Sequence, residues 1–157
     1  MIVVADTSPL NYLVLIDEIA LLPALFQKVL IPPAVLDELR HPGTSSKVRN
    51  WLAENPDWLE LCHLSKPVNA KLLSLDPGEQ EAIQLALERN IGTVLLDEAA
   101  GRRIVQELGL EARGTLGILE RGAKLGLTQF ASAFHKLEQT NFRISPALKA
   151  ALLSRNG

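Results

Sequence analysis

Two short apolar runs, each ending in an aspartate, constrain the fold of this chain more than any other feature of its sequence. Residues 2–5 (IVVA) end at Asp6, and residues 93–96 (TVLL) end at Asp97. Short runs that are rich in β-branched residues and stop abruptly are typical of buried strands. The sequence therefore predicts two core strands, each followed directly by a carboxylate.

Helical patterns fill most of the remaining chain. They cover residues 8–16, 18–26, 32–41, 46–55, 67–75, 78–90, 98–108, 114–125, 130–140 and 145–153. Two further extended segments are predicted at residues 28–31 and 58–64. Short strands that alternate with helices form parallel sheets, because parallel strands need crossover connections. We expect an α/β fold, a three-layer α/β/α sandwich with a mostly parallel central sheet, in a single domain of residues 1–157.

Composition narrows the class of protein. With 47% hydrophobic residues, the chain can bury a substantial core. The lone Cys62 excludes an intramolecular disulfide, and no Cys/His cluster has zinc-ligand spacing. No apolar stretch reaches the roughly 20 residues that span a bilayer, and no basic leader precedes the first apolar run. We expect a cytoplasmic protein with no membrane contact, and the net charge of −2 argues against uniform wrapping around nucleic acid.

Asp6 and Asp97 are the first candidates for a functional site. In open α/β sheets, ligands bind beyond the carboxyl ends of the strands, so the two carboxylates meet if their strands are neighbours. The alternative is that each aspartate only caps the following helix, which contributes about 1 kcal/mol. Ser-Pro at residues 145–146 begins a helix without an aspartate, so Ser-Pro at residues 8–9 can begin one too. Asp6 then remains available for another role.

Helical phase separates the other acids. At 100° per residue, Glu79 lies about 40° from Ile83, on the apolar face of its helix, whereas Glu81 lies about 160° away and faces water. Glu38 lies roughly 107° from the apolar centre of its own helix, and Asp37 about 150° away. Glu79 is therefore the stronger candidate of its pair, and Glu38 is more able than Asp37 to reach a cleft. The alternative for Glu79 is a favourable interaction with the helix dipole.

Several carboxylates that converge on one cleft raise one another's pKa unless a divalent metal neutralises them. Mg²⁺ or Mn²⁺ fits such a set, because both ions prefer oxygen ligands and bind phosphate-bearing substrates. A metal of this kind activates water and stabilises the charge that develops on a phosphodiester. The predicted chemistry is metal-assisted hydrolysis.

Five segments carry a resemblance to a known family: VVADTSPL, VLIPPAVLDEL, LDPGEQEAIQLALERN, TVLLDEAAGRR and GTLGILERGAKLGL. In this order and spacing they resemble PIN-domain proteins of the compact prokaryotic type that includes VapC-like toxin ribonucleases. The chain is also similar to a branch of predicted nucleic-acid-binding PIN proteins. The resemblance implies an α/β/α fold that binds Mg²⁺ or Mn²⁺ and cuts single-stranded RNA, often as the toxin of a type II toxin–antitoxin pair.

The resemblance implies catalytic acids at four positions: Asp6, Glu38, Glu79 and Asp97. Three of these, Asp6, Glu79 and Asp97, are the implied metal ligands. Glu79 takes the third acid position if the spacing to Asp97 is ungapped, and Glu81 takes it if two residues are missing. Many family members carry Asp there, so a glutamate lengthens the reach by one methylene.

Other side chains are implied or predicted beside these acids. The resemblance places the hydroxyls of Thr7 and Ser8 next to the first acid and Glu98 next to the last, as outer or alternative ligands. Arg102 and Arg103 follow Asp97 within about two helical turns, which makes them candidates for contacts with substrate phosphates.

The same basic stretch continues to Arg113, Arg121 and Lys124, and its alternative interpretation is an ordinary solvated helix face. The partners that the resemblance implies are RNA, a small antitoxin protein and a second copy of the chain. Two functions follow for testing. The first is a metal-dependent endoribonuclease, and the alternative is a non-catalytic PIN module that binds nucleic acid or protein. Four converging acids favour the first, because a binding module does not need them.

Overall fold

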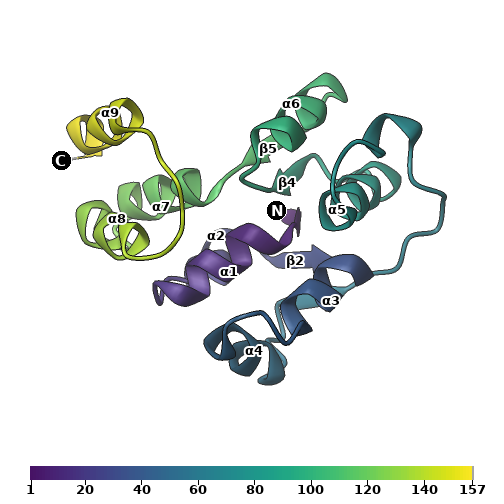
Figure 1. Cartoon of the computed structure of the whole chain (residues 1–157), viewed down its shortest axis with the longest axis horizontal. Helices are drawn as coiled ribbons and strands as arrows, with labels where there is room; N and C mark the ends of the chain where they lie inside the picture. The colour runs from purple at the N-terminus through teal and green to yellow at the C-terminus, as the bar shows by residue number, and fades with distance from the viewer. Residues whose placement is uncertain (157) are drawn as a thin grey trace.

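A five-stranded parallel sheet forms the centre of the protein in a computed structural model that describes residues 1–156 (Figure 1). Its strands are β1 (Ile2–Ala5), β2 (Lys28–Ile31), β3 (Leu59–Leu61), β4 (Thr93–Leu95) and β5 (Glu111–Arg113), in the spatial order β3-β2-β1-β4-β5. All four strand pairings are parallel. The chain runs outward from β1 to β3 and then crosses to β4, so the strand order reverses between β1 and β4.

Helices cover both faces of this sheet. They are α1 (Thr7–Leu15), α2 (Leu21–Leu25), α3 (Pro33–Arg40), α4 (Ser46–Ala53), the short 3₁₀ helix η1 (Ala70–Leu72), α5 (Pro77–Glu88), α6 (Ala99–Glu107), α7 (Thr115–Lys124), α8 (Phe130–Glu138) and α9 (Pro146–Asn156). Within residues 1–156, no helix has the length and apolar character that a bilayer crossing needs.

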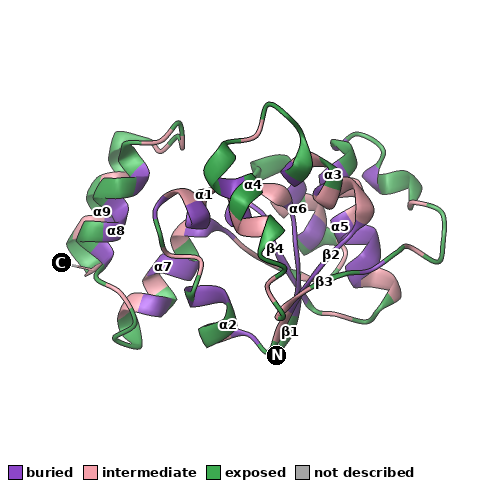
Figure 2. Cartoon of the chain, turned by 90° about the horizontal axis from the view of Figure 1, so that it is seen from below, coloured by how far each residue is buried: buried purple, intermediate pink, exposed green. Residues whose placement is uncertain are grey.

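Alternation along the strands divides the core into two layers. Val3 and Ala5 of β1 pack into the layer covered by α1 to α4 and α7 to α9, whereas Val4 packs into the layer covered by η1, α5 and α6. Successive side chains of a strand point to opposite faces, which explains why neighbouring residues enter different layers. Figure 2 shows the buried strands at the centre with exposed helix surfaces around them. The predicted three-layer α/β/α sandwich with a parallel sheet is therefore confirmed.

Some predicted elements are wrong or missing. Of the helix predicted at residues 67–75, only the single turn of η1 forms. Within residues 67–75, the buried residues are Leu72 and Leu75. Of the helix predicted at residues 18–26, only α2 forms. Asp17 has a positive φ of 61°, and the chain turns there before α2 begins. Strand β5 was not predicted. Its three residues include two charged ones and lie at the sheet edge, so they show no apolar run.

Candidate active site at the carboxyl edge of the sheet

The two aspartates that follow the core strands come to the same edge of the sheet. Strands β1 and β4 are hydrogen-bonded neighbours, with Ala5 opposite Leu95. The Asp6 N–H donates to the Leu95 carbonyl oxygen at 2.8 Å, which continues the pairing past the end of β1. This edge lies where the strand order reverses, the usual position of a ligand site in an open α/β sheet. The condition under which the two carboxylates come to one edge, that their strands are neighbours, is therefore met.

The first helix does not begin as the Ser-Pro comparison predicts. Helix α1 begins at Thr7, so Asp6 takes the N-cap position, but its side chain accepts no capping hydrogen bond. Ser145 does cap α9, since its Oγ accepts from the Leu148 N–H at 3.2 Å. Ser8 instead donates to Asp97 from inside the first turn of α1. The prediction that Ser8 starts the helix is wrong, whereas the inference that the Asp6 carboxylate is not used for capping agrees with the structure.

Asp6 and Glu38 converge on one glycine from different elements. A methyl group on Gly78, in the first turn of α5, would lie 3.0 Å from Asp6 Oδ1 and 2.5 Å from Glu38 Oε1. Glu38 is held in place by Thr7, whose Oγ1 donates to Glu38 Oε2 at 2.6 Å. The absence of a side chain at Gly78 thus leaves room for two carboxylates from α3 and the end of β1. Asp37, on the same helix as Glu38, is exposed.

Glu79 lies on the buried side of α5, as its helical phase predicts. Glu79 and Asp6 are each only 5% exposed. Glu79 Oε2 packs so close to Gly101 of α6 that a side chain at Gly101 would overlap it. Neither Glu79 Oε2 nor Asp6 Oδ1 has a hydrogen-bond partner, although both atoms are buried. A buried carboxylate oxygen without a donor lowers the stability of the folded protein, so we expect these two atoms to bind a cation or a proton.

Asp76 is an acid of this site that sequence reasoning missed. It caps α5 through its Oδ1, which accepts from the Glu79 N–H at 2.9 Å. Its charge acts on both Asp6 and Glu79. The signal for Asp76 was present in the sequence, because an Asp three residues before a Glu at a helix start has the spacing of a capping box.

Asp97 differs from the other acids because donors satisfy both of its oxygens. Ser8 Oγ donates to Oδ2 at 2.7 Å, the Thr115 N–H donates to Oδ1 at 2.7 Å, and Thr115 Oγ1 donates to Oδ2 at 2.9 Å. Thr115 begins α7, and sequence reasoning missed it as well. The hydroxyl at a helix start after Gly114 was the available signal. Asp97 therefore links the starts of α1 and α7 to the end of β4.

Burial is the main reason why Asp6 holds a proton near neutral pH. It raises the pKa of Asp6 to about 7; a hydrogen bond from the Thr7 N–H opposes this, and the charges of Asp76, Glu38 and Asp97 add to it. Mutual repulsion among the acids was predicted and is present, but it is smaller than the effect of burial.

Glu79 shows the same pattern more strongly. Burial, then hydrogen bonding with Asp76 and the charges of Asp76, Asp6 and Glu98, raise the pKa of Glu79 to about 8. The charge of Asp6 contributes to the raised pKa of Glu79, so the two carboxyls titrate as interacting groups. The two carboxyls with raised pKa values are also the two that bear oxygens without partners.

Glu81 has a different environment from the one predicted. It is half-buried rather than facing water, and its Oε1 accepts from the Ala34 N–H at 3.0 Å. Ala34 lies in the first turn of α3, so Glu81 satisfies a free N–H group at that helix end. This structural role accounts for Glu81 and favours Glu79 as the acid of the site. Glu98 is exposed at the N-cap position of α6 and makes no capping bond there.

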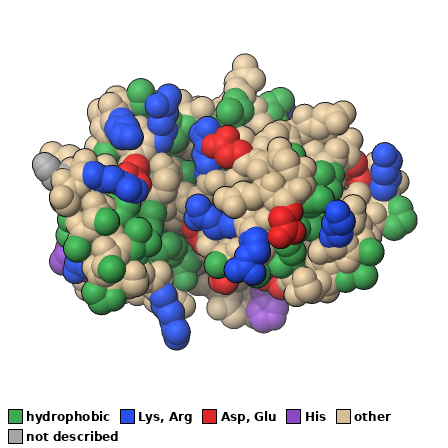
Figure 3. Space-filling model, turned by 90° about the horizontal axis from the view of Figure 1, so that it is seen from above, with side chains coloured by type: hydrophobic (Ala, Val, Ile, Leu, Met, Phe, Trp, Pro, Cys, Tyr) green, Lys and Arg blue, Asp and Glu red, His purple; other side chains and the backbone are tan. Residues whose placement is uncertain are grey.

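The two predicted phosphate contacts lie differently with respect to the acids. Arg102 is half-buried, and a side chain on Gly114 would lie 2.9 Å from both Arg102 Nη1 and Asp97 Oδ1. Arg102 therefore borders the acidic edge, whereas Arg103 is exposed. On the face shown in Figure 3, basic and acidic side chains are interspersed. Arg102 is the better placed of the two for contact with a bound phosphate.

A first hollow of about 480 Å³ lies on one side of the acids and is lined by Thr7, Glu38, His41 and Thr44, among others. His41 Nδ1 accepts from the Gly43 N–H at 2.9 Å, so the neutral imidazole carries its proton on Nε2. Thr44 Oγ1 donates to the Glu38 backbone carbonyl at 2.6 Å and holds this loop against the end of α3. The hollow thus combines a carboxylate with a fixed donor.

A second hollow, of about 400 Å³, lies on the other side and is lined by Ser8, Tyr12, Asp97, Phe142 and Arg143, among others. The rings of Tyr12 and Phe142 meet edge to face with their centroids 5.0 Å apart. Since Thr7 and Ser8 are consecutive, the start of α1 separates the two hollows. The C-terminal loop that supplies Phe142 and Arg143 was not recognised from the sequence.

The acids fit a hard cation by their chemistry, although the predicted ligand set is not assembled. No three acidic, histidine or cysteine side chains in the described part of the chain converge closely enough to hold an ion as they stand. Hydroxyl and backbone donors of Ser8 and Thr115 already engage both oxygens of Asp97. The buried, partnerless oxygens of Asp6 and Glu79 are nevertheless the kind of ligand that Mg²⁺ and Mn²⁺ accept.

Comparisons with known proteins agree with this architecture. The family model described as DUF3368, a PIN domain, matches residues 2–157. A PilT N-terminus domain protein from the hyperthermophilic archaeon Sulfolobus solfataricus P2 is similar in structure with a TM-score of 0.52. The two share 16% sequence identity, and the similarity covers 92% of this chain and 100% of the archaeal one. No protein with a curated description matches the chain.

The structural likeness supports the fold, and the family model supplies the assignment, because it extends over nearly the whole sequence. PIN domains generally use divalent metal ions, which agrees with the acidic character of the carboxyl edge. The protein therefore belongs to the PIN-domain family, a family of nucleases.

Proposed function

We propose that the protein is an endoribonuclease that cleaves single-stranded RNA with the help of Mg²⁺ or Mn²⁺. One observation carries the proposal: Asp6 Oδ1 and Glu79 Oε2 are buried at the carboxyl edge without any hydrogen-bond partner. A fold gains nothing from two such atoms, because each costs stability unless a cation or a proton compensates it. In a PIN domain, a divalent ion is the natural compensation.

Asp6 and Glu79 would hold the metal, with Glu38 next to Asp6 at Gly78. The bound ion would activate a water molecule and stabilise charge on the phosphodiester. The protein supplies the rest of the arrangement. Thr7 fixes the orientation of Glu38, and Ser8 fixes that of Asp97, so the start of α1 aligns two carboxylates at once.

The two hollows beside the acids provide room for nucleotides on both sides of the cleavage point. In the first, His41 presents Nε2–H as a donor, because Nδ1 is already engaged by Gly43. In the second, Tyr12 and Phe142 offer aromatic surface for a base, and Arg143 offers a cation for a phosphate. Unpaired bases reach such surfaces, whereas bases stacked in a duplex do not, so single-stranded RNA is the proposed substrate.

A role as the toxin of a type II toxin–antitoxin pair is part of the proposal, with a small antitoxin protein and a second copy of the chain as partners. Its support is the resemblance of the sequence to VapC-like toxins. A cytoplasmic location follows from that role. The test of the role is growth arrest on expression of the intact chain and its relief by the product of an adjacent small gene.

A non-catalytic module that binds nucleic acid or protein is the second candidate function. It is favoured by the lack, among residues 1–156, of three ligands that already converge on one point. This candidate predicts RNA binding without cleavage, and it does not require the Asp6 and Glu79 oxygens to meet a cation.

Cleavage of labelled single-stranded RNA by the purified full chain separates the two candidates. We expect cleavage with Mg²⁺ or Mn²⁺, none with EDTA, and a loss of at least about a hundredfold in Asp6→Asn or Glu79→Gln, as for removal of a group that acts with the metal. Glu107→Gln, at an exposed acid of α6, is the matched control and should cleave normally. RNA that stays intact with saturating Mn²⁺, together with undiminished RNA binding, would instead establish the binding module.

A further inference from the structure

A second region of concentrated charge lies away from the acids. A groove of about 870 Å³ opens between α2 and α7, and Met1 and Arg155 form parts of its wall. We call it the basic groove, after its four cationic side chains: Arg113, Arg121, Lys124 and Arg155. Met1 precedes β1 and Asp6 follows it, so the groove begins roughly 16 Å from the acidic edge along this strand.

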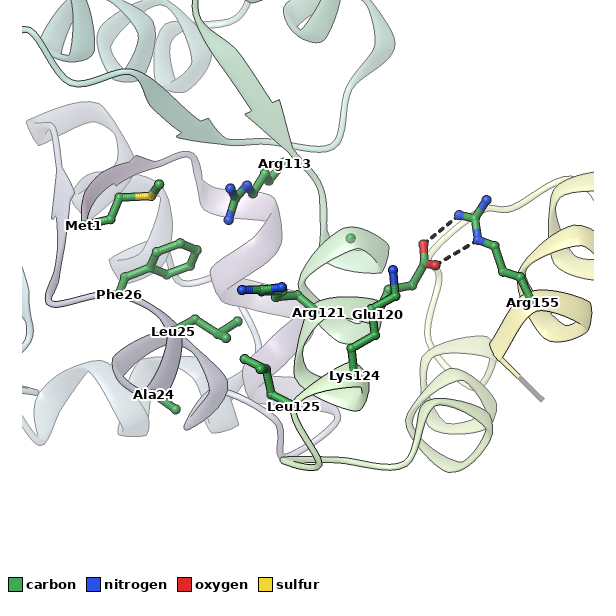
Figure 4. A pocket seen from close by; sticks show the side chains of 11 residues that line it. Met1, Ala24, Leu25, Phe26, Arg113, Glu120, Arg121, Lys124, Leu125 and Arg155 are labelled. Carbon is green, nitrogen blue, oxygen red and sulfur yellow. Dashed lines mark hydrogen bonds and ion pairs between the residues drawn. The ribbon is translucent and has the colours of Figure 1, made fainter.

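The cations of the basic groove are only partly neutralised. Arg113 pairs with Glu111 at 2.8 Å, and Arg155 pairs with Glu120 at 2.7 Å. In the part of the chain that the structure describes, neither Arg121 nor Lys124 has a carboxylate within ion-pair distance. Arg121 extends from α7 toward Leu25 and Phe26 in Figure 4. The groove therefore carries excess positive charge, although the whole chain has a net charge of −2.

Apart from Glu120, which pairs with Arg155, the rest of the wall has no charged side chain. Its large apolar side chains are those of Met1, Leu25, Phe26 and Leu125, and Met1 and Leu125 are 56% and 52% exposed. Exposed large apolar side chains that line one hollow, with charged groups around them, are typical of protein interaction sites. The basic groove combines this apolar floor with a cationic rim.

RNA is a poor occupant for this groove. Its aromatic residue, Phe26, is only 3% exposed, and the Arg113 guanidinium lies 5.9 Å above its ring. A base therefore finds no open ring on which to stack, and a phosphate backbone leaves the apolar floor uncovered. A peptide with both carboxylates and apolar side chains uses both kinds of surface, because arginine binds carboxylates with paired hydrogen bonds.

We propose that the basic groove docks an acidic, amphipathic segment of a partner protein. The carboxylates of the segment contact Arg121 and Lys124, and its apolar side chains cover Met1 and Leu125. This site is separate from the acidic edge, so docking does not depend on metal binding or on RNA cleavage. A variant without catalytic acids should bind the segment as well as the wild type does.

Fluorescence anisotropy with labelled synthetic peptides tests the proposal on the full chain. The probe is a short helical peptide with leucine on one face and glutamate on the other. Matched peptides replace its glutamates by lysine or its leucines by serine, and a single-stranded oligouridylate represents RNA. We expect binding of the acidic-apolar peptide, and a loss of at least about tenfold in Arg121→Glu/Lys124→Glu, the size usual for charge reversal at an interface.

Two further variants control for charge and folding. Lys71→Glu/Arg89→Glu changes the net charge equally at exposed positions outside the groove and should bind the peptide normally. Arg121→Gln/Lys124→Gln removes the charge without reversing it and should also weaken binding. Amide NMR shifts should move at Gly117 and Leu125 in the groove and stay fixed at Gly78 and Gly101 beside the acids.

Three results would overturn the proposal. One is the absence of peptide binding by the folded wild type. Another is that oligouridylate, measured in an Asp6→Asn background with EDTA, loses as much affinity as the peptide in Arg121→Glu/Lys124→Glu. The third is a wild-type dimer in sedimentation that this double variant dissociates, because the groove would then be an interface between two copies of the chain.

Discussion

The acidic edge and the basic groove both concentrate like charges, but the charges of the edge are buried whereas those of the groove are exposed to water. At the acidic edge, Asp6 and Glu79 are each 5% exposed and carry oxygens without partners, so their charged forms are costly. In the basic groove, Arg121 and Lys124 are exposed, and water screens their charges. Changes to the acids should therefore alter stability, its pH dependence and metal binding, whereas changes to the groove cations should have little effect on the fold.

The largest expected effect is a pH dependence of stability that comes from Asp6. Because its folded pKa is raised to about 7 from 3.8, the folded protein binds a proton that the unfolded chain releases. Stability is therefore full below the unfolded pKa and falls as pH rises toward the folded one, by about 3 kcal/mol between pH 5 and pH 8. Glu79 acts in the same direction.

Denaturant unfolding without metal, at several pH values, measures this effect. Asp6→Asn should be more stable than the wild type at pH 8 and lose most of that advantage at pH 5. Mg²⁺ or Mn²⁺ at pH 8 should restore the wild type and leave the variant unchanged. If the unfolding free energies of the two proteins changed with pH in the same way, burial would not raise the pKa of the Asp6 carboxyl.

Gly78→Ala should show the next largest effect. Its methyl group would approach Glu38 Oε1 at 2.5 Å and Asp6 Oδ1 at 3.0 Å, so the carboxylates must move. We expect a loss of roughly 1–3 kcal/mol in unfolding free energy, and lower metal affinity in calorimetric titration. A variant that keeps both the stability and the metal affinity of the wild type would show that the acids do not converge at Gly78.

Thr115→Val should follow in size, because it removes the hydroxyl that donates to Asp97 Oδ2 at 2.9 Å. Ser8 and the Thr115 N–H keep their bonds to Asp97, so the expected loss is about 1–2 kcal/mol in thermal or denaturant unfolding. Unlike Asp6→Asn, this variant should lose stability at pH 8. An increase in stability there would mean that Asp97 is as unsatisfied as Asp6.

The smallest effects belong to the basic groove. Gly117 lies in α7 with nothing within 4 Å of an added methyl group, so Gly117→Ala should stabilise the protein by up to about 1 kcal/mol. Arg121→Gln should change stability by less than about 0.5 kcal/mol. Both are measured in the same unfolding experiments. If Gly117→Ala destabilised the protein while Gly78→Ala left its stability unchanged, the basic groove would be the more sensitive of the two regions, contrary to our expectation.

Much of the fold was readable from local pattern. The β-branched runs at residues 2–5 and 93–96 identified β1 and β4, and their alternation with helices gave the parallel sheet. Strand β5 escaped because its three residues, at the sheet edge, have no apolar run. The predicted helix at residues 67–75 failed because two buried leucines do not sustain a helix of that length.

The acids were predictable to different degrees. Helical phase places Glu79 on the buried side of α5 before any contact is known, since the period of a helix is fixed. The same reasoning misjudged Glu81, whose partner is the Ala34 N–H on another helix. Thr115 and Arg143 were missed as parts of the site because they join it from elements far along the chain, and a local pattern does not specify which distant helix start or loop meets a carboxylate.

The sequence by itself determined four of the five strands in the described part of the chain, the position of an aspartate after each of two of them, and the inward phase of Glu79. These features depend on local periodicity, which the chain carries in its order of residues. Only the tertiary structure decided that Asp97 is satisfied by Ser8 and Thr115, whereas Asp6 Oδ1 is left without a partner. The reason is that burial and hydrogen bonding depend on the packing of distant segments, and these set the energy of a carboxylate more strongly than its place in the sequence does.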